Sequence, residues 1–141
     1  MTDSHQHLSG HCFCTAVKWS YKGPQGRNLV CHCIDCQRAT SAPFAAFICL
    51  SQEHVQVTGP INHFESSPST HRGFCQNCGT RMYFRSNKWP DEIHFLATTL
   101  DDPSDYSPTA QVCLDTRLKW LDTLDQISGH CTFQKDPTEI E

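Results

Sequence analysis

The sequence predicts a mainly β domain built of short antiparallel strands. Short runs of apolar and alternating residues recur along the chain, and glycine or proline residues separate them, which is typical of antiparallel β domains. Cysteine is unusually frequent, with 10 residues in a chain of 141, and most of these cysteines lie in three tight clusters. A chain of this length forms one domain around one core.

The first half of the chain carries the clearest strand patterns. Residues 16–21 alternate between apolar and polar side chains and end at the turn signal Gly23-Pro24-Gln25-Gly26. A later apolar run ends at Leu50 and predicts a buried strand. In chain order, the pattern predicts strands at residues 16–21, 29–30, 44–50 and 55–58, and one helical turn at residues 35–40.

The second half continues with strands that turns and loops separate. Trp89-Pro90-Asp91 divides two of the strands, and residues 101–108 predict a loop. Residues 117–124 fit either a short helix or a strand. The predicted strands are at residues 62–65, 82–84, 93–97 and 110–114, with a turn at residues 66–69.

The domain boundaries follow from composition. Residues 1–8 are polar and rich in histidine, which predicts a flexible N-terminal tail, and His5, His7 and His11 are interpreted as solvated side chains that could bind stray metal. Residues 9–125 form the single predicted domain, and residues 126–141 a C-terminal extension. No linker divides the chain.

Charge and hydropathy exclude several classes. With 11 Lys and Arg against 15 Asp and Glu, the formal charge is −4, and no basic block suggests nucleic-acid binding. The longest uncharged apolar run, residues 42–50, is too short to cross a membrane. The first residues lack a basic start followed by an apolar stretch, so no secretory signal is visible and we expect a cytoplasmic protein.

Cysteine spacing favours metal over disulfides. In a reducing compartment many cysteines indicate metal binding, whereas a secreted fragment that has lost its signal would use them in disulfides. Tetrahedral zinc with Zn–S bonds of ~2.3 Å holds two sulfurs ~3.8 Å apart, which C-x-C and C-x-x-C motifs achieve. Gly79, directly after Cys78, suits the tight knuckle that a C-x-x-C motif needs. The clusters are Cys12-Phe13-Cys14, Cys31-His32-Cys33-Ile34-Asp35-Cys36 and Cys75-Gln76-Asn77-Cys78.

The ligand count suggests two zinc ions per chain. Four thiolates close a structural zinc site, whereas three leave one position open for chemistry. The preferred partition gives the closed site to the outer clusters and leaves Cys31, Cys33 and Cys36 for the open one. In an alternative partition, Cys33 and Cys36 join the C-x-x-C cluster as a zinc ribbon. The closed site of the preferred partition consists of Cys12, Cys14, Cys75 and Cys78.

Over roughly residues 8–125, these motifs together resemble the glutathione-dependent formaldehyde-activating enzyme family, which includes centromere-protein-V-like members. The resemblance rests on the combination of motifs, since no single motif is specific. Two positions depart from the usual pattern: Thr15 and Ser41 stand where glycine is common. Besides the three clusters, the matching segments are Gly10-His11, Gln37-Arg38, Ser41-Ala42-Pro43-Phe44, Gly79-Thr80, Leu100-Asp101-Asp102-Pro103 and Trp120-Leu121.

The resemblance implies a β-tent-like fold of antiparallel sheets held by two zinc sites. It also implies that the outer clusters hold the structural zinc and that Cys31, Cys33 and Cys36 hold the catalytic zinc. The family's founding activity joins formaldehyde to glutathione as S-(hydroxymethyl)glutathione, a carbon–sulfur lyase reaction. The expected substrate is therefore a small thiol or thiol adduct, and glutathione is a possible one.

Several residues near the proposed open site could bind the substrate or support the metal ligands. Arg38 is the cation best placed in the sequence to hold a substrate carboxylate, ahead of Arg72, Arg81 and Arg117, although each also fits an exposed solubilising role. We expect His32 to point away from the metal and Asp35 to form a turn.

The three isolated cysteines have different predicted roles. Cys49 is expected in the core, Cys113 could face either way, and Cys131 is expected to be a free thiol. A fourth ligand from one of these residues would close the catalytic site and remove its chemistry.

Three functions compete on this evidence. The favoured one is a zinc-dependent carbon–sulfur lyase acting on a small thiol adduct. The alternative is a non-catalytic zinc module that binds a protein partner. A chromatin or nucleic-acid binder is the third, and the acidic balance of the chain disfavours it.

Overall fold

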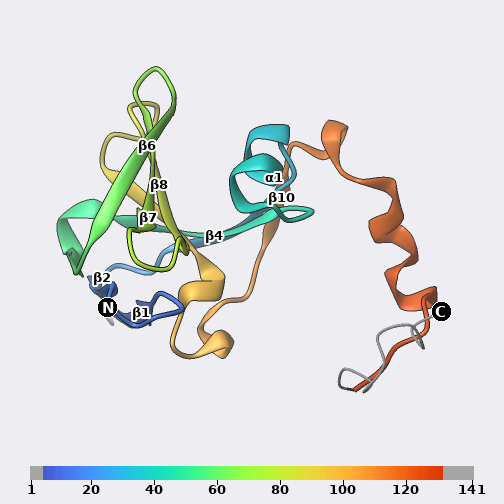
Figure 1. Ribbon diagram of the computed structural model, residues 1–141, viewed down its shortest axis with the longest axis horizontal. Coiled ribbons are helices and arrows are strands. Elements are labelled where there is room, and N and C mark those ends of the chain that lie inside the picture. Colours follow the sequence, from blue (N-terminus) through green and yellow to red (C-terminus); the bar gives the residue numbers. More distant parts are fainter. Residues whose placement is uncertain (1–4, 132–141) are drawn as a thin grey trace.

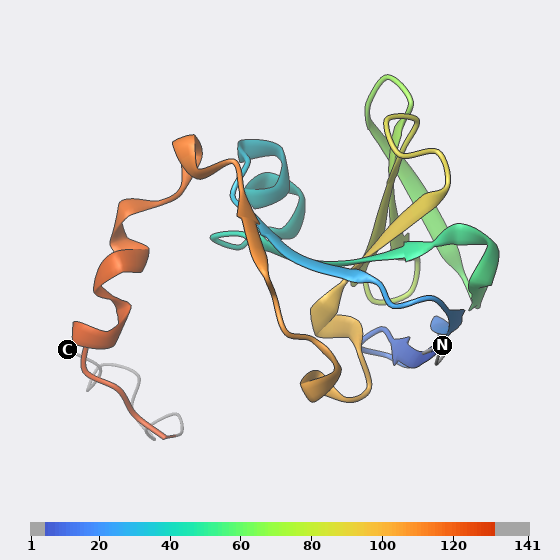
Figure 2. The ribbon, with the colours of Figure 1, turned by 180° about the vertical axis from the view of Figure 1, so that it is seen from behind.

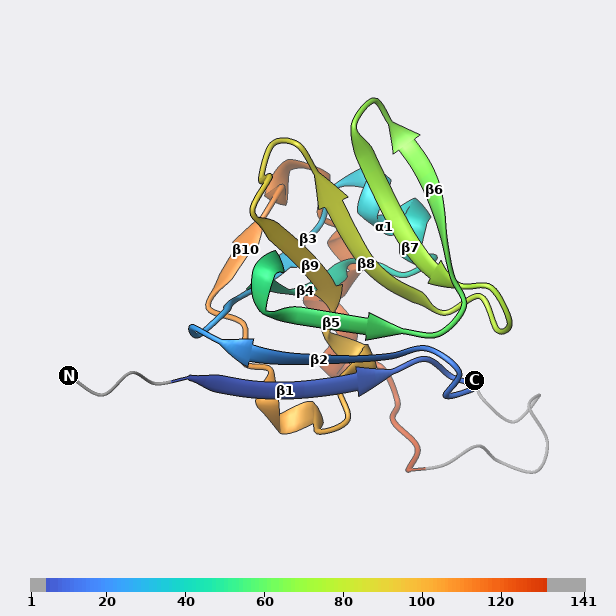
Figure 3. The same ribbon diagram turned by 90° about the vertical axis from the view of Figure 1, so that its left-hand side faces the viewer.

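Two β-sheets make up most of the structure. The computed structural model describes residues 5–131. The smaller sheet has the order β1-β2-β5 and is antiparallel throughout. Its strands are β1 (Gln6–His11), β2 (Lys18–Gly23) and β5 (Val55–Thr58), which lie side by side in Figure 3. Strand β2 alternates strictly between exposed and buried residues, so Trp19 and Tyr21 both face the core.

The larger sheet has seven strands in the order β10-β3-β4-β9-β8-β7-β6. All of its neighbours pair antiparallel except β10, which pairs parallel with β3. The predicted antiparallel architecture is therefore confirmed with one parallel edge pair. The strands are β3 (Arg27–Cys31), β4 (Ala45–Ser51), β6 (Ile61–Ser67), β7 (Thr70–Cys75), β8 (Arg81–Ser86), β9 (Glu92–Leu96) and β10 (Ala110–Val112).

Strand β4 runs through the middle of the molecule and is buried on both faces (Figure 1). Ile48 and Leu50 pack into the main core between the sheets, whereas Phe47 and Cys49 belong to a second cluster on the opposite face. This arrangement follows from the two-residue period of a strand, and it explains why residues 44–50 read as one continuous apolar run. The main core is centred on Phe95, whose ring stacks on Trp19 at 4.1 Å.

The one α-helix within residues 5–131, α1 (Ile34–Thr40), follows β3 closely. The sulfur of Cys33 caps its N-terminus by accepting a hydrogen bond from the amide of Cys36 at 3.2 Å. Ser41 ends the helix in the left-handed conformation, with φ of 51°. The predicted helical turn is thus confirmed, one residue longer at its start.

Five 3₁₀ helices complete the described chain, and the last two lead away from the sheets, as Figures 1 and 2 show. This final segment is mostly exposed, although Leu121 is buried. Within residues 5–131, no helix is both long and apolar enough to span a membrane. The 3₁₀ helices are η1 (Gln52–His54), η2 (Ala97–Thr99), η3 (Pro103–Asp105), η4 (Leu114–Thr116) and η5 (Lys119–Gln126).

Two strands have no counterpart among the predicted elements. β1 includes residues 6–8, so the flexible tail predicted for residues 1–8 is wrong there; its alternation buries only Leu8 and Gly10 and leaves polar side chains outside. The sequence does not predict β7 as a strand, because its residues, Thr-His-Arg-Gly-Phe-Cys, are mostly polar and include a glycine. Residues 1–4 and 132–141, parts of the predicted tail and extension, lie outside the described residues.

Candidate metal centres and adjoining cavity

The sulfurs of Cys12, Cys14, Cys75 and Cys78 form one cluster, called here the first sulfur group. All four lie within 4.8 Å of one another, although Cys14 and Cys75 are 61 residues apart in the chain. Two of the separations are 3.6 Å, from Cys12 to Cys14, and 3.8 Å, from Cys14 to Cys75. Tetrahedral zinc bound by thiolates requires ~3.8 Å between sulfurs, so this donor set fits zinc.

Backbone hydrogen bonds shape the loop after β7 into a tight turn. The amide of Gly79 donates to the carbonyl of Cys75 at 2.8 Å, and Gly79 has a φ of 76°, which confirms the predicted need for a small residue there. Thr80 links the two halves of the group, because its hydroxyl accepts from the amide of Phe13 and contacts the Cys78 sulfur at 3.1 Å. The hydrogen bond from Thr80 lowers the pKa of Cys78 to about 5, which favours the thiolate that a metal requires.

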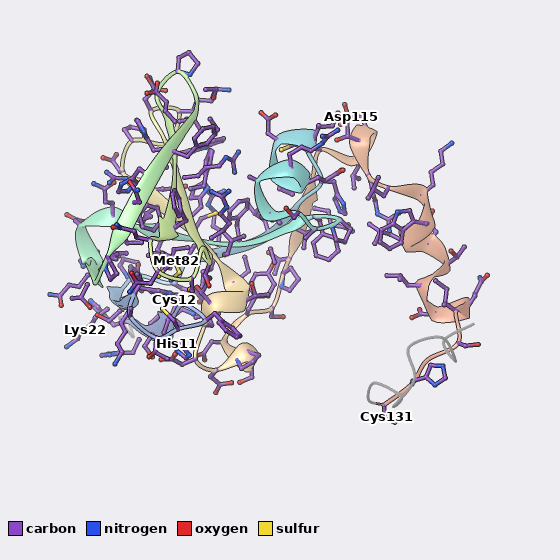
Figure 4. All side chains as sticks on the ribbon, viewed as in Figure 1. His11, Cys12, Lys22, Met82, Asp115 and Cys131 are labelled. Atoms are coloured by element: carbon purple, nitrogen blue, oxygen red, sulfur yellow. The ribbon has the colours of Figure 1, made fainter. Side chains whose placement is uncertain are left out.

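The turn between β1 and β2 carries the other half of the group. The amide of Cys12 donates to the carbonyl of Val17, and the amide of Val17 donates to the Cys12 sulfur at 3.2 Å. Thr15, in the middle of this turn, has a φ of 67°. Cys12 and Met82, labelled in Figure 4, are both fully buried and belong to the main core.

Cys31, Cys33 and Cys36 form the second sulfur group, and their sulfurs also lie within 4.8 Å of one another. Cys31 is the last residue of β3, Cys33 caps α1, and Cys36 lies in its first turn. The hydrogen bond from Cys36 lowers the pKa of Cys31 to about 5, and the same interaction raises the pKa of Cys36. Three clustered thiols, one of them readily ionised, fit a metal that keeps one position for another ligand.

A cavity of about 450 Å³ adjoins the second sulfur group and is called here the sheet-face cavity. Its walls are mainly apolar, with Leu29, Phe47, Phe84 and Trp89 among them. Three cationic side chains and one acidic side chain also line it: Arg27, Arg72, Lys88 and Asp35. A larger hollow of about 1030 Å³ lies beside the first group, but no cysteine of the second group lines it.

Cys113 lies next to the second sulfur group. It follows β10, whose last residue Val112 pairs with Cys31, and it has a left-handed φ of 59° that ends the strand. Its thiol lines the sheet-face cavity beside Cys31 and contributes to lowering the pKa of Cys31. The group of three sulfurs within 4.8 Å does not extend to Cys113. The strand predicted for residues 110–114 is therefore shorter, and its cysteine faces the site.

A third cluster, absent from the predicted sites, unites Cys49, Glu92 and His94. Arg27 already holds the Glu92 carboxylate at 2.7 and 2.9 Å, and the His94 ring contacts it at 2.7 Å. Burial raises the pKa of Cys49 to about 12 and lowers that of His94. Cys49 is thus a buried thiol, as predicted. Pairing of Cys49 with His94 across β4 and β9 creates this cluster. The residues are far apart in the chain, so no local sequence motif predicts it.

The other residues considered in the sequence lie in different environments. His32 is buried and does not line the sheet-face cavity, and its Nε2 lies 2.8 Å from the Gln111 side-chain oxygen. Asp35 is exposed in the first turn of α1, and Arg38 is exposed in its last turn, outside the sheet-face cavity. Cys131 is exposed, far from the sheets in Figure 4.

Comparisons with known proteins agree with the cysteine pattern. Residues 7–116 match the family described as glutathione-dependent formaldehyde-activating enzyme. A protein of Schizosaccharomyces pombe named an uncharacterized lyase is 30% identical over 108 residues, which cover 77% of this chain and 79% of the relative. A solved Rhodobacter sphaeroides protein has a similar fold, with a TM-score of 0.57 and 19% identity over 74% of this chain and 99% of the other. The chain therefore belongs to the glutathione-dependent formaldehyde-activating enzyme family.

Proposed function

We propose that this protein is a zinc-dependent carbon–sulfur lyase that acts on the adduct of a small thiol with formaldehyde, such as S-(hydroxymethyl)glutathione. Family membership and the lyase-named relative support a lyase-type enzyme. The observation that carries the finer proposal is the second sulfur group, three thiols that line a cavity large enough for a small substrate.

In this proposal the two sulfur groups hold one zinc ion each. The first group supplies four thiolates and joins the β1–β2 turn to the loop after β7. Cys31, Cys33 and Cys36 supply three ligands, and zinc bound there would stabilise a substrate thiolate and polarise a carbonyl oxygen.

The reaction needs no oxidant or reductant. In the synthetic direction the thiol sulfur attacks the formaldehyde carbon, a C–S bond forms, and the carbonyl π electrons move to oxygen. The oxygen gains one proton as the sulfur loses one, so the products balance. The apolar walls of the cavity, Leu29, Phe47 and Phe84, limit water at the reacting atoms, which strengthens every charge interaction there.

A second candidate function has one observation in its favour. Cys113 directly follows Val112, the strand partner of Cys31, and lines the same cavity as Cys31, so a movement of this residue would let it become a fourth ligand of the second group. A metal with four thiolate ligands has no open position, and the protein would then be a non-catalytic zinc module that binds a protein partner.

Metal analysis and X-ray absorption spectroscopy separate the two candidates. The lyase requires two zinc ions with seven cysteine sulfurs among their ligands, and a zinc signal that changes when glutathione is added. Turnover of glutathione and formaldehyde by the zinc-loaded protein then tests the activity. Eight sulfur ligands and no response to glutathione would establish the closed module instead.

A further inference from the structure

Arg72 occupies an unusual position for an arginine. It is only 7% exposed, yet none of the ion pairs within residues 5–131 includes it. Its Nε donates to the Ser66 hydroxyl at 3.1 Å, and its guanidinium carbon lies 5.0 Å from the centre of the Phe84 ring. A buried guanidinium is costly unless an anion accompanies it. Within the described residues only Nε makes a hydrogen bond, and the other N–H donors of Arg72 are not among the fully buried unpaired atoms, so they are open to the cavity that Arg72 lines.

The guanidinium borders the sheet-face cavity. Thr70 and Arg72 alternate with exposed His71 along β7, so both point to the side of the sheet where the cavity lies. The hydroxyl-bearing residues Ser67, Thr70 and Ser86 line the same end. Such a set of N–H and O–H donors is suited to a carboxylate.

A cross-strand row relates Arg72 to the sulfurs. Successive pairings align Arg27 with Cys49, Cys49 with His94, His94 with Phe84, and Phe84 with Arg72. Two aromatic rings lie between the ends of the cavity: the Arg72 guanidinium lies over the Phe84 ring, whose centre is 6.1 Å from that of Phe47. Phe47 in turn packs in the same cluster as Cys31 and Cys36. The two ends of the cavity are therefore well separated, and a ligand that reaches both must be extended.

The cations at this end differ in what they already bind. The Arg27 guanidinium is occupied by Glu92, and Lys88 is an exposed side chain. Arg38, which the sequence favoured because it follows the second cluster, does not line the cavity. Arg72 thus remains the buried cation that faces the cavity without a carboxylate partner.

We propose that Arg72 holds a carboxylate of the substrate at the end of the sheet-face cavity remote from Cys31, Cys33 and Cys36. The inference rests on the proposed lyase function and deepens it: the substrate is an acidic, peptide-like thiol, with its sulfur at the second group and a carboxylate at Arg72. Short or neutral thiols cannot make both contacts at once.

The test uses a ligand that cannot react. S-methylglutathione keeps both carboxylates of glutathione but has no free thiol, so its binding reports the anchor and not the chemistry. Calorimetric titration of the full-length, zinc-loaded protein compares this ligand with its dimethyl ester. We expect the substitution Arg72→Met to weaken binding of the free acid by about 10- to 100-fold. Arg72→Lys should recover part of the loss, and the ester should bind poorly and equally to all variants.

Arg81 provides the matched control. Its guanidinium carbon lies 5.2 Å from the centre of the Phe74 ring, the same kind of contact, but it lines the hollow beside the first group. Arg81→Met should leave the Kd of S-methylglutathione within about twofold. Near-UV circular dichroism and zinc content check that each variant is folded. If Arg72→Met does not fold, Arg72→Gln, which retains a polar N–H donor without the charge, takes its place, and unchanged binding of the free acid to that variant overturns the anchor.

Three results would each overturn the anchor: no binding of S-methylglutathione to the unaltered protein, equal binding of acid and ester, or unchanged binding after Arg72→Met. Failure of the lyase proposal has a different signature. In that case glutathione and formaldehyde are not turned over, although binding of S-methylglutathione still depends on Arg72 and on the free carboxylates.

Discussion

The two sulfur groups contain the same kind of side chain but differ in the segments that supply their cysteines and in their surroundings. The first joins two loops that are 61 residues apart, and Cys12 and Cys75 within it pack into the main core. The second takes all three cysteines from a six-residue segment, and it lies on the other face of the large sheet, beside a cavity. A distant crosslink stabilises a fold, whereas a local cluster leaves its surroundings free for a ligand.

The shapes of the neighbouring cavities support the same division. The hollow beside the first group has a volume of about 1030 Å³, and the sulfur group there already has four members. The sheet-face cavity has apolar walls, a buried arginine at one end and three sulfurs at the other. Number of ligands and access to a cavity, rather than cysteine content, therefore distinguish the two groups.

The largest effect is expected on removal of a ligand from the first group. Cys14 is exposed, so Cys14→Ser removes a sulfur with little loss of packing. Structural zinc contributes on the order of 10 kcal/mol to folding, comparable with the whole stability of a small domain. We expect the variant, like the protein treated with a strong chelator, to be unfolded by circular dichroism and to lack both zinc ions. A folded Cys14→Ser protein would show that the first group is not a structural zinc site.

The matching change in the second group should spare the fold. Serine is a favoured N-cap, so Cys33→Ser retains a hydrogen bond to the Cys36 amide while it removes a sulfur ligand. We expect a folded protein whose lyase activity falls by about 100-fold or more. Zinc content and turnover measured on the same sample check this, with Cys131→Ser as the control. Unchanged turnover would separate the activity from the second group.

A smaller effect is expected from substitution of Cys113. This substitution tests whether a metal in the second group has three protein ligands and one open position. If Cys113 is only a neighbour of Cys31, Cys113→Ser retains both zinc ions and changes activity by no more than about threefold. X-ray absorption then gives the same number of sulfur ligands before and after the change. Loss of one sulfur ligand per chain would instead identify Cys113 as the fourth ligand.

The sequence predicts local features of this protein better than long-range ones. The C-x-C and C-x-x-C spacings indicate metal because ligand geometry is set within a few residues, and the half-buried strand at residues 55–58 matches β5 residue for residue. Strand β1 pairs with β2 and its Gly10 also bridges to Leu100, and Arg72 lies over Phe84 of the neighbouring strand. Nothing within the segments themselves specifies these contacts.

The smallest effect concerns backbone strain beside each group. Thr15 in the turn of the first group and Ser41 at the end of α1 both have positive φ, at 67° and 51°. A residue with a Cβ atom is strained in this conformation by ~1–2 kcal/mol, and glycine offsets part of the gain by its greater unfolded-state entropy. Thr15→Gly and Ser41→Gly should therefore each stabilise the zinc-loaded protein by about 0.5–1 kcal/mol.

Gly79 provides the reverse experiment. Its φ is 76°, and a Cβ atom added there meets no other atom within 4 Å, so Gly79→Ala introduces backbone strain without a clash. We expect this variant to lose about 1 kcal/mol in denaturant unfolding, opposite in sign to the two glycine substitutions. One outcome would separate the two sites: Ser41→Gly stabilises the protein, whereas Thr15→Gly does not. In that case zinc bound to the first group, rather than the backbone preference of residue 15, determines the conformation of the β1–β2 turn. The second group would then be the one whose framework forms without its metal, as its local origin in β3 and α1 implies.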